Sequence, residues 1–89
     1  MDVDELARAV ESCPSVARLA PGRGVEVATY LPGRRVRGIR VGEGGIEVHV
    51  AARYGPTMTE VAGEVRDAVA AHLGAEPVAV YIDEVELPG

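Results

Sequence analysis

The chain has 89 residues, of which 47% are hydrophobic and 26% charged, and its net charge is −5. This balance predicts one globular domain spanning residues 1–89 and excludes a disordered chain. No apolar run reaches the roughly 18 residues that a membrane span needs, and residues 1–6 hold three acids and no basic segment, unlike a secretory signal. The single Cys13 excludes an intrachain disulfide and fits a reducing compartment. We therefore expect a cytoplasmic protein.

The N-terminal segment predicts a short helix. Asp2 and Glu5 have the spacing of a capping box, in which the first side chain accepts from the backbone three residues on. The helix should end at Cys13-Pro14, because the residue before a proline is pushed out of the α region. Three strands are expected next, over residues 15–19, 25–30 and 34–41.

The clearest strand of the chain covers residues 46–53, where the even-numbered positions are apolar. The turn Gly42-Glu43-Gly44-Gly45 predicts that it forms a hairpin with the segment before it. The odd positions Glu47, His49 and Arg53 then project from the opposite face.

A second capping box, Thr57-Met58-Thr59-Glu60, opens a helix over residues 57–73. Gly63, in the middle of that helix, is explained by a close approach between helix and sheet. The last strand covers residues 78–86, and its apolar alternation slips in phase, which predicts a bulge near Asp83-Glu84.

These elements predict an α+β fold, a two-layer α/β sandwich of the order α-β-β-β-α-β. The sheet should be mixed but mostly antiparallel, and both helices should cover one face, because each has a single apolar stripe. A right-handed crossover would lay the last strand parallel to the strand before the second helix. The open face should carry Glu47, His49, Arg53, Tyr81 and Asp83.

Charge is unevenly distributed along the chain. Residues 13–41 sum to +5, whereas residues 1–12 sum to −3 and residues 42–89 to −7. The basic middle is either an ordinary solvated surface, which is the commoner case, or it pairs with the acidic ends within one molecule or between molecules. Its densest part is the basic cluster, which consists of Arg34, Arg35, Arg37 and Arg40.

The sequence predicts no catalytic, cofactor or metal site. Cys13 lies at a helix C-terminus, where the dipole disfavours a thiolate, so an inert thiol is expected. His72 should be a packed edge residue of the second helix, and His49 an ordinary exposed histidine. An acid–base or metal-dependent enzyme centred on His49 is the less favoured alternative. The Gly42–Gly45 turn lacks the sequence and the following helix of a phosphate-binding loop.

Several segments are similar to the alkaline-shock-protein family of bacterial envelope stress-response proteins, including its short, actinobacterial-type members. The segments are Glu26–Val36, Gly38–Val41, Ile46–Val50, the Arg53-Tyr54-Gly55 corner, the helix from Thr57 with Glu60-Val61 and Val65, and Val78–Val85. The resemblance implies a non-enzymatic, abundant cytoplasmic protein that self-associates and is recruited to the inner face of the cell membrane by a separate anchor protein.

We therefore expect a self-associating or partner-binding module without cofactors. The expected partner surface consists of Arg34, Arg35, Arg37, Arg40, His49 and Arg53. The alternative is a small nucleic-acid-binding protein that uses the basic cluster. The scarcity of aromatic residues and the negative net charge count against it, because stacking platforms are few and phosphates are repelled.

Overall fold

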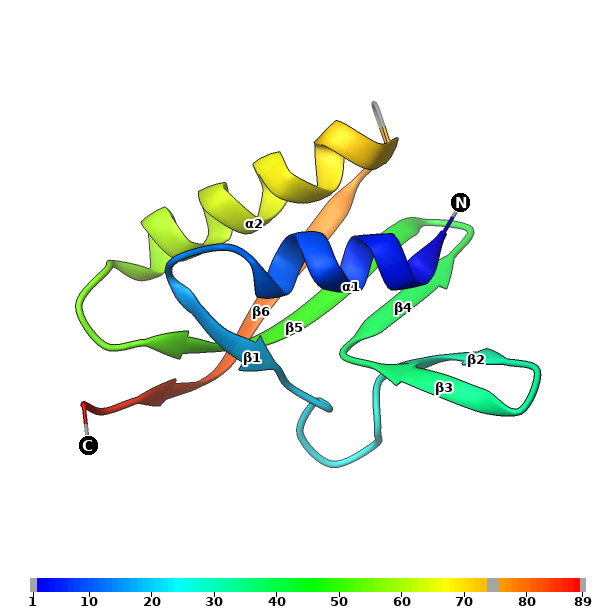
Figure 1. The fold of residues 1–89 in the computed structure, drawn as a ribbon, viewed down its shortest axis with the longest axis horizontal. Helices are drawn as coiled ribbons and strands as arrows, with labels where there is room; N and C mark the ends of the chain where they lie inside the picture. The colour runs from blue at the N-terminus through cyan, green and yellow to red at the C-terminus, as the bar shows by residue number, and fades with distance from the viewer. Residues whose placement is uncertain (1, 74–75, 89) are drawn as a thin grey trace.

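The computed structural model describes residues 2–73 and 76–88 and has two helices packed on a four-stranded sheet, with a two-stranded hairpin beside it (Figure 1). The helices are α1 (Val3–Glu11) and α2 (Met58–Leu73). The strands are β1 (Val16–Leu19), β2 (Ala28–Leu31), β3 (Arg34–Arg37), β4 (Ile39–Gly42), β5 (Gly45–Arg53) and β6 (Val78–Glu86). The expected α+β sandwich is confirmed.

Strand β5 is the centre of the larger sheet. Strand β6 pairs with it in parallel along its whole length, from Ile46↔Val78 to Arg53↔Glu86. On the other side, β4 pairs antiparallel with the first half of β5, and β1 with the second half. The parallel β5–α2–β6 unit is the one predicted from the crossover rule. It leaves β6 at the edge of the sheet.

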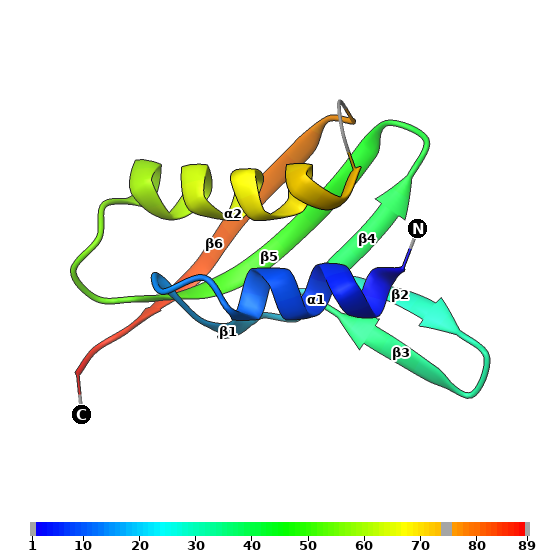
Figure 2. The same ribbon diagram turned by 45° about the horizontal axis from the view of Figure 1, so that its top comes forward.

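The core lies between the sheet and the two helices, which cover the same face (Figure 2). Most of its aliphatic side chains come from α1, α2 and β5, and β1 and β4 add Val16 and Ile39. The residues of the three main elements are Leu6, Ala7 and Val10 of α1, Val61, Val65 and Val69 of α2, and Ile46, Val48, Val50 and Ala52 of β5. The chain has no Phe or Trp, so close packing of these small residues provides the hydrophobic stabilisation.

Both predicted helix N-caps form, and the one at Thr57 is a reciprocal capping box. The Asp2 carboxylate accepts hydrogen bonds from the backbone N–H groups of Asp4, at 3.0 Å, and Glu5, at 3.3 Å. At the start of α2, the Thr57 hydroxyl accepts from the Glu60 N–H at 3.1 Å, and the Glu60 carboxylate accepts in return from the Thr57 N–H at 3.4 Å. These bonds satisfy N–H groups that the first helical turn leaves unpaired.

The predicted bulge lies in β6 at Asp83. The pairing passes from Val50↔Ile82 directly to Ala51↔Glu84, so Asp83 is the extra residue. A bulge re-aims side chains next to it. Here the side chains of Asp83 and Glu84 both make contacts on the open face, with His49 and Arg18.

The sequence predicted one strand over residues 34–41, but the structure has two, β3 and β4. The segment divides at Gly38, whose φ is +90° and whose missing Cβ would lie 2.9 Å from the Ala20 carbonyl oxygen. Gly38 donates to Val27 and accepts from His49, so it joins the two sheets. The observed order is therefore α-β-β-β-β-β-α-β, with β2 and β3 in a separate hairpin.

Two smaller expectations also need correction. The second strand begins at Ala28, not at residue 25. Gly63 does not mark a close approach between helix and sheet, because a Cβ added there would meet nothing within 4 Å. Its backbone freedom is therefore a cost to α2 with no packing gain.

Candidate functional site

The basic cluster is engaged with acids of the same chain. Arg34 makes a two-pronged ion pair with Asp4 of α1, with Nη1 2.7 Å from Oδ1. Arg35 and Arg37 of β3 share the Glu26 carboxylate, at 3.1 and 3.3 Å. Arg40 of β4 binds Glu47 of β5 at 3.0 Å.

These contacts decide how the uneven charge of the sequence is balanced. The Arg34 guanidinium lowers the pKa of Asp4 below its ordinary value, chiefly through the hydrogen bonds it donates, and the pKa of Arg34 is raised in turn. Asp4 belongs to the acidic N-terminal segment. Within the single chain described, the basic cluster therefore makes the intramolecular pairing that was one of the alternatives from sequence. The pairs are exposed, so each contributes little to stability.

His49 is buried, with 7% of its surface exposed, and the expectation of an ordinary exposed histidine is wrong. Its Nε2 lies 2.6 Å from Glu47, and its Nδ1 lies 3.0 Å from Asp83. The ring stacks on Tyr81, its register partner in β6, with centroids 4.6 Å apart. Its backbone is fixed as well, because His49 donates to Gly38 and accepts from Ala20.

His49 therefore connects β5 to β6, and we call its contacts with Glu47, Asp83 and Tyr81 the polar tie. An imidazole that carries protons on both nitrogens donates one hydrogen bond to each carboxylate, whereas a neutral ring has one proton to donate. The bond from His49 is the main reason that the pKa of Glu47 lies below its ordinary value, with Arg40 contributing further. Both ring nitrogens are occupied, so neither is directed at an external substrate or metal ion.

A second set of side-chain contacts crosses the same open face of the sheet. Arg18 of β1, Ala51 of β5 and Glu84 of β6 are register partners in one row across the sheet. The Arg18 guanidinium passes over the fully buried Ala51 to bind Glu84, and it also binds Glu86 at 3.0 Å. The Asp83 carbonyl accepts from Arg23. Glu84 and Glu86 of β6 are therefore paired with a cation of their own chain, and the Asp83 carboxylate with His49.

The remaining residues singled out in the sequence do not join a site. Arg53 is exposed at the end of β5, away from the basic cluster. His72 is exposed, so it is not the packed residue that the sequence suggested. Cys13 is buried, and burial together with the negative Glu64 raises the pKa of its thiol. A raised pKa agrees with the inert thiol predicted from sequence.

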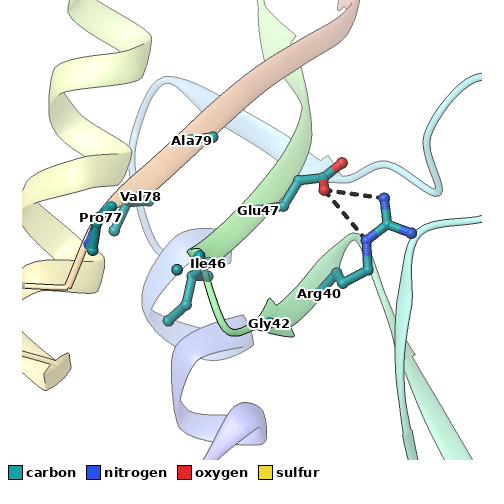
Figure 3. Close-up of a pocket in the computed structure, with 9 residues that line it drawn as sticks. Arg40, Gly42, Ile46, Glu47, Pro77, Val78 and Ala79 are labelled. Atoms are coloured by element: carbon teal, nitrogen blue, oxygen red, sulfur yellow. Dashed lines mark hydrogen bonds and ion pairs between the residues drawn. The ribbon is translucent and has the colours of Figure 1, made fainter.

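One pocket lies between the β4–β5 turn and the start of β6 and has a volume of about 380 Å³ (Figure 3). The Arg40–Glu47 ion pair stands at one side of it, and Ile46, Pro77 and Val78 stand across from that pair (Figure 3). The other lining residues are glycines and Ala79. The pocket thus has one ion pair and an apolar wall, and this lining is better suited to contact with another molecule than to catalysis.

A second pocket, of about 430 Å³, lies between α2 and β6 and was not foreseen from sequence. We call it the edge groove, and it is lined by Met58, Thr59, Ala62, Arg66, Val80, Tyr81 and Ile82. Met58 is 57% exposed and Tyr81 48% exposed, and Val85 and Leu87 farther toward the C-terminus are exposed as well. The sequence did not predict this groove because it forms where β6 is the edge strand. Whether β6 lies at the edge depends on which strands pair with it and not on its own residues.

Neither a metal centre nor a membrane span is found in residues 2–73 and 76–88. No group of three or more His, Cys, Asp or Glu side chains there is arranged to hold a metal ion. No helix in the same part of the chain is long and apolar enough to cross a membrane.

Comparison with known proteins gives no match, because no family model, no curated protein and no solved structure matches this chain.

Proposed function

We propose that this chain is a non-enzymatic protein of the envelope stress-response type that works by binding itself or another protein. The observation that carries the proposal is the free edge of β6 beside the edge groove. An edge strand with exposed apolar neighbours is a template for pairing with another chain. The resemblance of residues 26–36 and of roughly residues 36–87 to the alkaline-shock-protein family supports the same class.

The proposed binding surface differs from the one expected from sequence. Arg34, Arg35, Arg37 and Arg40 each hold a carboxylate already, so a partner would have to displace it. The outer side of β6 pairs with no strand in the described part of the chain. Recruitment to the inner face of the cell membrane by an anchor protein belongs to this proposal and rests on the family resemblance alone.

The nucleic-acid alternative receives less support. Backbone-binding proteins present free cations to phosphate, and their affinity comes from the counterions that those contacts release. The four guanidinium groups of the basic cluster are already paired with three carboxylates, those of Asp4, Glu26 and Glu47, so little of their charge is left for phosphate. Titration of labelled short DNA and RNA at low salt tests the alternative, with the double variant Arg35→Glu plus Arg37→Glu as its control.

Light scattering tests the proposal directly. The mass of the particle should rise above the 9.3 kDa of one chain as the protein is concentrated. The rise should persist at high salt, because apolar contact and backbone hydrogen bonds are not screened as ion pairs are. A strict monomer at high concentration and low salt would remove self-association, and the proposal would then rest on a different partner protein.

A further inference from the structure

The outer side of β6 has a defined set of backbone groups. The Pro77 carbonyl accepts from the Ile46 N–H at 2.9 Å, so it points toward β5. The Val78 carbonyl accepts instead from Arg66 Nε of α2 at 3.3 Å. Successive residues of a strand direct their backbone groups to opposite sides. The N–H and C=O groups of Val80 and Ile82 therefore point outward, like those of Val78.

This outer edge is free over a short stretch with clear limits. At one end, Arg66 occupies the carbonyl of Val78. At the other end, the bulge at Asp83 interrupts the alternation, and the Asp83 carbonyl accepts from Arg23. Between these limits lies the segment 80–82, which is also the part of β6 that lines the edge groove.

The segment is chemically complementary to itself. Val80 and Ile82 are β-branched and uncharged, and they flank Tyr81, which projects from the opposite face of the strand. When two copies of such a segment run antiparallel, Val80 of one faces Ile82 of the other and the two Tyr81 residues face each other. Contacts within the chain reduce the repulsion from the nearby acids, because His49 holds Asp83 and Arg18 holds Glu84 and Glu86.

We propose that a second copy of this chain occupies the edge groove, with the two β6 strands antiparallel and the twofold axis at Tyr81. This inference rests on the proposed function and specifies its partner. The facing pairs Val80–Ile82 exchange hydrogen bonds through their outward groups. Met58 and Ala62 of each α2 lie along the new strand pair. A twofold axis uses the free edge of both copies, so the assembly closes as a dimer instead of growing into a fibre.

Disulfide trapping tests the position of the axis. In a Cys13→Ala background, Tyr81→Cys places two thiols at a facing pair without mutual hydrogen bonds, where Cα atoms are about 4.5 Å apart and a disulfide forms readily. Ala79→Cys is the matched control, because it lies on the same face and is also exposed. In the proposed register its two copies are offset by four residues, roughly 14 Å, which is too far for a disulfide.

The expected result is that mild oxidation shifts Tyr81→Cys to twice the mass of one chain and leaves Ala79→Cys at 9.3 kDa. Trapping of Ala79→Cys instead, or of neither variant when light scattering shows a dimer, would overturn this register while self-association stands. A monomer by light scattering would overturn the inference and leave the proposed function to a different partner.

Amide hydrogen exchange on the unmodified chain covers the case in which Tyr81→Cys fails to fold. Exchange at the Val80 and Ile82 N–H groups should slow as the protein concentration rises. Exchange at Val41, at the far edge of the sheet in β4, should stay constant. Concentration-independent exchange at Val80 and Ile82 would contradict the inference.

Discussion

The basic cluster and the edge of β6 are two surfaces that differ in whether their polar groups already have partners within the same chain. Arg34, Arg35, Arg37 and Arg40 are conspicuous in the sequence, but each binds a carboxylate of the same molecule. The residues 80–82 of β6 look like an ordinary strand, yet their outward backbone groups and the apolar groove beside them have no partner strand in the described part of the chain.

The difference teaches where binding capacity lies in a small domain. A dense run of charged residues in a sequence does not show how much charge is available to a partner, because ion pairs within the chain can occupy those side chains. An edge strand offers backbone groups whatever its side chains are. The two surfaces therefore make opposite predictions about mutation, pH and salt, and each experiment below separates them.

The largest effect is expected on the polar tie that holds β6 in place. His49→Ala should lower the free energy of unfolding by about 3 kcal/mol, because it leaves two partly buried carboxylates without their shared partner. Urea unfolding measures the change. His72→Ala, at the exposed histidine, is the control and should stay within about 0.5 kcal/mol of the parent chain. Equal effects of the two substitutions would contradict the assigned role of His49.

Proline substitutions separate the two sides of β6. Ala79→Pro removes an N–H that the alternation directs toward β5 and leaves an acceptor unpaired, so it should cost about 2 kcal/mol of stability. Val80→Pro removes an outward N–H, which edge strands tolerate, and should abolish dimer formation while circular dichroism shows a folded chain. A dimer that survives Val80→Pro would argue against the β6 interface.

The pH dependence of stability tests the tie from the acid side. The pKa of Glu47 is lower in the folded chain than its ordinary value. Its contribution is therefore fully present above the ordinary glutamate pKa and is lost as the pH falls through the folded value. Glu47→Gln should remove about 1.5 kcal/mol at neutral pH and flatten stability below about pH 4.5. Thermal melts at stepped pH measure both effects, and an unchanged slope would count against the tie.

The basic cluster should matter less than its density suggests. Arg35→Glu plus Arg37→Glu breaks the exposed ion pairs with Glu26, at a cost of about 1 kcal/mol or less. The dimer measured by light scattering should be unchanged. Loss of the dimer in this variant would return the interface to the surface expected from sequence.

The smallest effect is expected at Gly63 in α2. Gly63→Ala should raise stability by roughly 0.5–1 kcal/mol, because the added Cβ meets open space and the helix gains propensity. The strength of the dimer should not change, since Gly63 does not line the edge groove. A weaker dimer would place α2 closer to the partner than we propose.

Much of the fold was predictable because its signals are local. The N-cap at Asp2, the capping box at Thr57, the turn before β5 and the bulge at Asp83 each follow from a few neighbouring residues. The break at Gly38 was missed because it depends on a contact with Ala20 and His49, which are remote in sequence.

The candidate site was harder to predict for a related reason. The partners of His49 come from two positions brought together by the parallel crossover, one of them re-aimed by the bulge. Alternation placed Glu47, His49, Tyr81 and Asp83 on one face correctly, but it carries no information on depth. Burial of His49 follows from the stacked Tyr81 and from the strands on either side of β5.

The row Arg18–Ala51–Glu84 reverses a familiar preference at its central position. Strands ordinarily favour β-branched residues, and Ala51 is a weak strand former in the longest-paired strand of the sheet. Its small size is what lets a guanidinium reach from β1 to β6 above it. Valine at residue 51 would be a conservative change by residue type, yet its larger side chain would stand between Arg18 and Glu84 and hinder their ion pair. Tolerance at residue 51 is thus governed by two side chains to which it makes no bond.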